Sequence, residues 1–304
     1  LQRRSTNPSR PFLKGFVRLS GSAAEVANKL GPLAGLEGSW HGDDGWNMIA
    51  VPSINHGKPT FTLLVQHYTE TIKFTAIGAP VPNRGGETEQ FITGLTYELT
   101  VTDKKTLGIL HIENGMWLNM ADVQRQPDGP VTLKAPAPLP MQFSIARMSS
   151  IPHGDVIMAL GNATTSKGDF SIPDINAKPV DMGKTDLGYL DPYKFIKQFP
   201  QFSAGNPNMM LQKAIKGQHI GNVTTIHVDT RNQGGNISNI PFIHEHVNAS
   251  RFFSTYWIED VSMDGINFKQ LQYSQQADLD FLPKFGMEGL IMWPHVNVNT
   301  LRKQ

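Results

Sequence analysis

Apolar and polar residues alternate along much of this chain with a period of two, which is typical of half-buried β-strands. The clearest run is 271–281, where the odd positions are mostly apolar and the even positions are polar. It follows Asp264-Gly265, a dipeptide that suits the positive φ angles of a tight turn, so residues 254–281 are predicted to form a β-hairpin. The same alternation at 95–119, interrupted by Asp103-Lys104-Lys105, predicts a second hairpin.

Repeated hairpins indicate either a β-sandwich or a closed barrel. Closure removes the exposed strand edges that promote aggregation, so we expect an all-β fold built on a closed antiparallel barrel. A few short helices are expected beside it. One is predicted at 206–217, where Asn206 and Pro207 suit a helix start and Gly217 suits a helix end.

The chain between Gly168 and Pro207 contains five prolines and shows little alternation of apolar and polar residues. Long irregular segments inside compact domains are usually functional lids or disordered loops. We expect this one to cover one mouth of the barrel and to limit access to its cavity.

Composition narrows the possible functions of the 304 residues. The formal net charge is +1 and there is no dense basic run, so nucleic acid is a poor candidate partner. Cysteine is absent, which excludes disulfides, zinc–thiolate sites, iron–sulfur clusters and thiolate-ligated haem. No stretch approaches the roughly 18 apolar residues of a membrane span, and the first residues lack a signal-peptide segment, so a cytoplasmic location is expected. Oligomeric state is not indicated.

Four blocks of sequence, taken in order, carry a family resemblance. They are Leu36 to Gly42 (LEGSWHG), Tyr68 to Pro80 (YTETIKFTAIGAP), Leu110 to Leu118 (LHIENGMWL) and Ser144 to Ser149 (SIARMS) followed by Pro294-His295-Val296 and the basic ending Leu301-Arg302-Lys303. Together they resemble the nitrobindin family of haem-binding β-barrels, which have a lipocalin-like or fatty-acid-binding-protein-like architecture. The matches cover 36–150 and 252–303. We therefore expect an N-terminal arm at 1–35 and a barrel domain at 36–304, with 151–251 as an insertion.

The resemblance implies haem b as the cofactor, with His295 as the proximal ligand of the iron. It also places His111, Leu110, Trp117 and Met148 around the haem. With no cysteine available, a neutral imidazole is the usual axial donor. Parity puts His295 on one strand face with Asn297 and Asn299, a polar face for a haem pocket. The alternative is a surface histidine at the start of a strand.

Two further residues are candidates for catalysis. His111 lies in the segment that places a cavity-facing histidine in the family, where it would do acid–base work or bind a diatomic ligand; the alternative is a hydrogen-bonded core histidine. Arg147 would stabilise a developing anion or a propionate, unless it is a solvated surface residue. His244-Glu245-His246 places two imidazoles on one face, but no third metal ligand is evident, and a solvated loop is favoured.

The favoured function is therefore a haem protein that reacts with small oxidants or diatomic gases. The resemblance implies nitric oxide binding and isomerisation of peroxynitrite. An organic substrate held under a lid would instead direct the same site toward peroxidase or peroxygenase chemistry with peroxide. The competing hypothesis is a lipocalin-like carrier that holds an apolar small molecule without haem.

Overall fold

The structure is a computed structural model that describes residues 28–77, 81–83, 90–121, 124–125, 139–140, 142–168 and 170–304. Most of these residues lie in strands, which confirms the expected all-β fold with a few short helices. The elements are η1 (Gly31–Leu36), β1 (Gly38–Asn55), β2 (Lys58–Ala76), β3 (Val81–Asn83), β4 (Gln90–Asp103), β5 (Ile109–Asn119), β6 (Gln124–Arg125), β7 (Leu139–Pro140), β8 (Ile145–Ser150), β9 (Asp155–Lys167), α2 (Asp191–Lys194), α3 (Asn208–Ala214), β10 (His219–Asp229), β11 (Asn236–Asn239), α4 (Pro241–His244), β12 (Asn248–Met263), β13 (Ile266–Pro283) and β14 (Leu290–Lys303).

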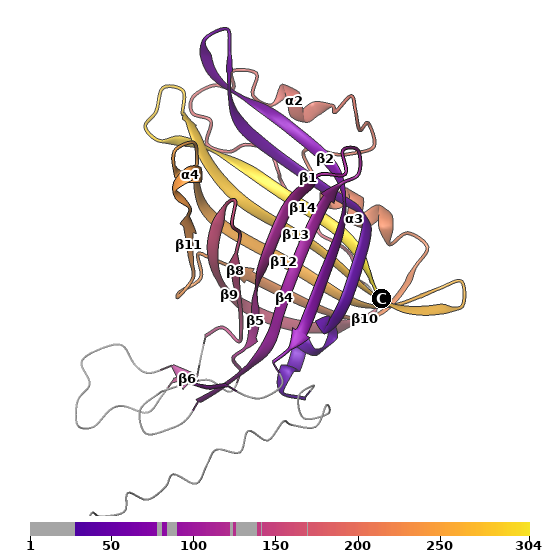
Figure 1. The fold of residues 1–304 in the computed structure, drawn as a ribbon. Helices are drawn as coiled ribbons and strands as arrows, with labels where there is room; N and C mark the ends of the chain where they lie inside the picture. The colour runs from indigo at the N-terminus through magenta and orange to yellow at the C-terminus, as the bar shows by residue number, and fades with distance from the viewer. Residues whose placement is uncertain are drawn as a thin grey trace, which may run out of the picture.

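Ten of the strands close into an antiparallel barrel, in the order β1-β2-β4-β5-β8-β9-β10-β12-β13-β14 (Figure 1). The last strand, β14, pairs with β1, and β9 pairs with β10. Asp264 and Gly265 join β12 to β13 with φ angles of 51° and 77°, which is the turn that this dipeptide predicts. The predicted hairpin at 95–119 is formed by β4 and β5, and the predicted helix at 206–217 contains α3.

The sequence predicts 151–251 as an insertion, but β9 and β10 lie inside that range and belong to the barrel wall. The physical reason is closure, because without these two strands the edges of β8 and β12 would lack partners. The irregular excursion is therefore limited to the stretch between β9 and β10. The predicted Gly78-Ala79-Pro80 turn lies outside the described residues.

One end of the barrel is filled and closed. Trp40, Trp117, Leu271 and other inward side chains are buried there in one cluster. The short helix η1 covers this end with Leu33 and Leu36, and Trp40 Nε1 donates a hydrogen bond of 2.7 Å to the carbonyl oxygen of Leu36. Of the predicted arm at 1–35, residues 28–35 therefore form part of this cover, and 1–27 lie outside the described residues.

The excursion between β9 and β10 packs on the outside of the wall. Along β14, Val296 and Val298 point outward, opposite to His295 and its neighbours, and pack in one cluster with Phe202 and Met210 of the excursion. The helix α3 lies beside β14 (Figure 1). Other residues of the excursion reach the end of β14 near His295, where Tyr189 packs on Trp293 at 5.6 Å. The lid over this mouth stays a prediction. Apolar outward side chains on β1 and β14 need a cover, and the excursion supplies it.

No helix among the described residues has both the length and the apolar character needed to cross a membrane.

Candidate functional site

Three histidines gather at the barrel end opposite η1, and we call this the histidine end. His111 comes from β5, His153 from the turn between β8 and β9, and His295 from β14. His153 Nε2 lies 3.1 Å from His111 Nδ1, and the two rings meet edge to face. Burial is the main cause that lowers the pKa of His295, and the charges of His111 and His153 lower it further, so these two imidazoles lie near enough to act on it.

His295 faces the barrel interior together with Asn297, as its parity predicts. Its Nε2 lies 2.8 Å from Oδ1 of Asn47, and Asn297 Nδ2 donates to the same oxygen at 2.9 Å. Asn47 Nδ2 in turn donates to Gln66, which fixes the amide orientation. We infer that His295 carries its proton on Nε2 and has a lone pair on Nδ1. Burial, with His111 and His153 adding to it, lowers the pKa of His295 to about 4, so the ring is neutral near pH 7.

Glu113 and Arg147 form a buried ion pair beneath the histidines. Arg147 Nη2 donates to Glu113 Oε1 at 2.8 Å, and both side chains are buried. Burial alone would raise the pKa of Glu113, but the charge of Arg147 and the hydrogen bonds from His111 and Tyr97 outweigh it and hold the pKa well below its usual range. Four aromatic rings surround the guanidinium at 5.0 to 5.8 Å: Tyr97, Trp117, Phe252 and Tyr256.

The remaining donors of Arg147 are used inside the barrel. Nε donates to the hydroxyl of Tyr97 at 3.3 Å, and Nη1 donates to Ser254 and Gln275. Tyr97 also bonds Ser149 at 2.7 Å and donates to Glu113. Arg147 therefore anchors Glu113 from within the core, in contrast to the solvated surface residue that was its alternative.

A second buried carboxyl, Glu70 on β2, lies in the same interior. Its Oε2 accepts hydrogen bonds of 2.7 Å from Tyr273 and from Asn299, while Oε1 is buried without a partner. Tyr68 bonds Tyr273 at 2.8 Å. Burial raises the pKa of Glu70 to about 7, although the two hydrogen bonds and the charge of His111 oppose the shift. The pKa values of Glu70 and Glu113 are thus shifted in opposite directions. Near neutral pH Glu70 can hold a proton, whereas Glu113 stays ionised.

The other predicted pocket residues are not all brought together. Trp117 is buried under the guanidinium of Arg147, and its Nε1 has no partner. Leu110 is half-buried at the irregularity where β5 leaves regular pairing with β4, and it packs against the interior cluster. Met148 points outward and is 37% exposed, so it lies on the opposite side of the wall from His295.

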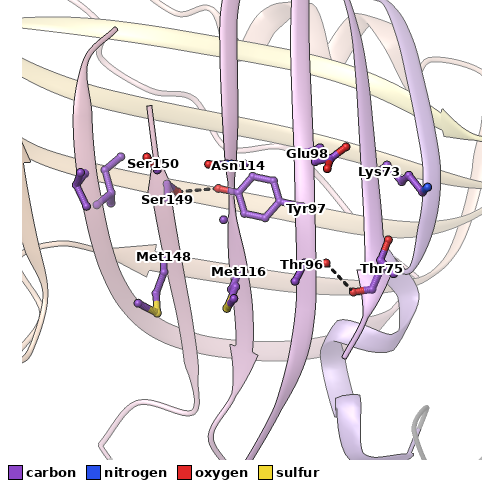
Figure 2. Close-up of a pocket in the computed structure, with 13 residues that line it drawn as sticks. Lys73, Thr75, Thr96, Tyr97, Glu98, Asn114, Met116, Met148, Ser149 and Ser150 are labelled. Carbon is purple, nitrogen blue, oxygen red and sulfur yellow. Dashed lines mark hydrogen bonds between the residues drawn. The ribbon is translucent and has the colours of Figure 1, made fainter. Parts of the chain in front are cut away.

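Met148 lines a groove of about 530 Å³ on the outer face of β2, β4, β5, β8 and β9. Figure 2 shows Met116 beside Met148 in this groove, with Thr75 and Thr96 on the neighbouring strands. Gly115 forms part of the groove and pairs with Tyr97 and Ser149, whose side chains turn inward. Tyr97 and Ser149, which belong to the buried network of Glu113, also line the groove beside Gly115.

His244-Glu245-His246 lies at the end of α4 and is exposed. Within the part of the chain that the structure describes, no three His, Cys, Asp or Glu residues are grouped so as to hold a metal ion. The preferred interpretation of this tripeptide as a solvated segment agrees with its exposure.

Sequence reasoning did not single out three residues of the site: His153, Glu70 and Tyr273. Glu70 had a usable signal, because it interrupts the inward series of Tyr68, Ile72 and Phe74 with a charged residue. A charge at an inward strand position is costly unless it is paired or protonated. His153 had no such signal, since a turn has no periodicity.

The chain matches no known protein family, and no curated protein matches it. Among solved structures it is similar to Rv2717c from M. tuberculosis, with 16% sequence identity, a TM-score of 0.39, and coverage of 92% of this chain and 97% of that chain.

Proposed function

We propose that the histidine end of the barrel binds haem b, with His295 as the axial ligand of the iron. The observation that carries the proposal is a neutral imidazole on the inner face of the last strand, near two further histidines. It agrees with the nitrobindin-like blocks, which lie on both sides of the excursion in the sequence.

The residues around His295 fit a ligated imidazole. A metal-bound histidine usually donates its other ring N–H to a protein oxygen, which fixes the tautomer and the ring orientation. Asn47 provides this oxygen at 2.8 Å, so Nδ1 is the nitrogen left to bind the iron. The low pKa of His295 also means that no proton has to be displaced near pH 7.

An apolar wall lies beside His295 on the neighbouring strands. Ala277 pairs with His295, and Leu279 pairs with Trp293. Leu279, Phe281 and Trp293 are buried in one cluster, to which Ala277 also packs. Phe61 and Tyr189 already cover Trp293, so a porphyrin ligated by His295 would contact the wall at Ala277, with Asn297 and Asn47 on its polar side.

Haem held in this position would supply an iron with an open coordination site for a diatomic gas, peroxynitrite or peroxide. The chain's own residues would bind and orient the cofactor and would move protons at the histidine end. An organic substrate is a further option of the same site. The carrier hypothesis concerns the same interior, in which aromatic side chains fill the η1 end and Glu70, Glu113 and Arg147 lie beyond them.

The proposal is tested by adding hemin to the purified chain and recording the Soret absorption. We expect stoichiometric binding by the wild type and at least a tenfold weaker affinity for His295→Ala. His244→Ala is the matched control. His244 is an exposed histidine at the end of α4, so its removal should leave the hemin titration unchanged.

Equal affinity of His295→Ala and the wild type would overturn the assignment of the ligand. A wild type with no Soret band that instead binds an apolar fluorescent probe in the barrel would favour the carrier.

A further inference from the structure

A chain of hydrogen bonds runs from the rim of the histidine end into the core. His153 is exposed on the turn between β8 and β9, and its Nε2 lies 3.1 Å from Nδ1 of His111. The other nitrogen of His111, Nε2, lies 3.2 Å from Oε2 of Glu113. Arg147 holds Oε1 of the same carboxylate at 2.8 Å.

The partners in this series of hydrogen bonds restrict where protons can lie. Glu113 is ionised and only accepts hydrogen bonds, so His111 Nε2 must carry a proton. One proton then lies between His111 Nδ1 and His153 Nε2. When both rings are neutral, that proton belongs to His153, and His153 Nδ1 has a lone pair at the rim.

We propose that His153 is the acid–base group of the histidine end, that His111 stores the positive charge and that Glu113 positions His111. His153 Nδ1 takes a proton from a bound molecule, the Nε2 proton of His153 passes to His111 Nδ1, and the new cation lies on His111 next to Glu113. His153 ends neutral with a proton on Nδ1. The reverse movement returns one proton, so no other reactant is needed.

The arrangement follows the logic of a base oriented by a third group. It differs from the expectation that His111 itself meets the substrate, because both ring nitrogens of His111 are engaged by protein groups. His111 therefore acts through His153 and does not itself contact the bound molecule. The molecule bound at the rim would be small and would gain or lose a single proton there. This inference rests on the proposed function.

The charged and titratable groups that face the pair come from three strands. Glu113 lies on β5, His295 on β14 and Glu70 on β2. Glu113 favours a cation on His111. Burial and the charge of His111 lower the pKa of His153, so the second ring resists a proton once the first is charged.

The test is an NMR titration of the ligand-free protein labelled with ¹⁵N-histidine, in which two-bond ¹H–¹⁵N spectra report the protonation of each ring nitrogen. In the wild type, the signals of His111 and His153 should change together with a single midpoint. In His111→Gln, the pKa of His153 should move up toward the ordinary 6.5, because the neighbouring charge is removed. His244→Gln is the control and should change neither ring.

Separate midpoints for His111 and His153 in the wild type would overturn the proposal, as would an unchanged titration of His153 in a folded His111→Gln protein. If His111→Gln does not fold, the wild-type titration still decides. A shared midpoint in a protein that fails to bind hemin would disprove the proposed function and support the acid–base assignment, so the two failures are distinguishable.

Discussion

Arg147 and Glu113 show how a single buried pair shapes this interior. An isolated charge of either sign would be costly in the core, and the pair is tolerated because hydrogen bonds satisfy the remaining donors and acceptors. Tyr97 is central, since it contacts both members of the pair. The position of His111 depends in turn on Glu113.

Removing the negative member of the pair should therefore destabilise the fold. In Glu113→Gln the guanidinium of Arg147 keeps its charge but loses its counterion, and we expect a loss of about 3–5 kcal/mol in the free energy of unfolding. Urea denaturation followed by tryptophan fluorescence would measure it. Glu98→Gln, an exposed carboxylate on the adjacent β4, is the control. A loss as small as that of the control would contradict the structural role given to the pair.

Glu70 should make stability depend on pH in the opposite way to an ordinary salt-bridged acid. Its folded pKa of about 7 is raised above the ordinary 4.5, so the folded state holds the proton more tightly. The stabilisation is complete below about pH 4.5 and is lost as the pH rises to about 7, by roughly 3 kcal/mol in total.

The neutral isostere Glu70→Gln should remove this part of the pH dependence. Urea unfolding of both proteins at pH 5 and at pH 7.5 would show a smaller difference for the variant than for the wild type. Identical pH profiles would mean that Glu70 is ionised throughout this range.

At the scale of elements, local irregularities decide which residues face inward. The register of β1 against β2 shifts between Gly42 and Gly45, so Trp40 points into the barrel and Trp46 points out of it. Trp46 then stacks on His67 and Phe202, on the outside of the wall. A single inserted residue therefore creates the apolar outer face that the excursion covers.

Gly161 on β9 lies where the barrel closes, between β8 and β10. It pairs with Ile145 on one side and with Val228 on the other. A Cβ atom at this position would lie 1.7 Å from the backbone oxygen of His227, so the strands would have to move apart.

We expect Gly161→Ala to lower the free energy of unfolding by about 1–3 kcal/mol and to increase hydrogen exchange of the β10 amides. Gly108→Ala is the control, because its Cβ would meet only Thr106 Oγ1, at 3.4 Å. Protection of β10 that matches the wild type would show that closure tolerates a side chain at this site.

At the scale of the whole molecule, the two ends of the barrel interior differ. Side chains such as Trp40, Trp117 and Leu271 fill the η1 end, and η1 covers it. The histidine end contains the imidazoles, Glu113 and Glu70. Under the proposed function, a ligand bound at the histidine end would add stability by mass action.

Hemin should therefore raise the stability of the entire barrel. At about 100 times the dissociation constant, ligand that binds only the folded state adds about 2.7 kcal/mol. The urea midpoint of the wild type should rise when hemin is added, and that of His295→Ala should not. An equal rise in both proteins would indicate hemin bound at a site that does not include His295.

The alternation of apolar and polar residues determined the all-β class and many of the strands, while a sandwich and a barrel both stayed compatible with it. It also determined the shared face of His295 and Asn297, because side chains in a strand alternate strictly between its two faces. Asp264-Gly265 fixed one hairpin, since few other dipeptides adopt two consecutive positive φ angles at low cost.

Only the tertiary structure decided which strands close the barrel and which groups meet inside it. The pairing of β9 with β10, the packing of the excursion on the outer face and the outward direction of Met148 depend on partners far away in the sequence. The contact of His153 with His111 spans 42 residues and begins in a turn, where no local pattern constrains the side chain. Periodicity assigns a residue to a face, whereas closure of the sheet decides what lies across from it.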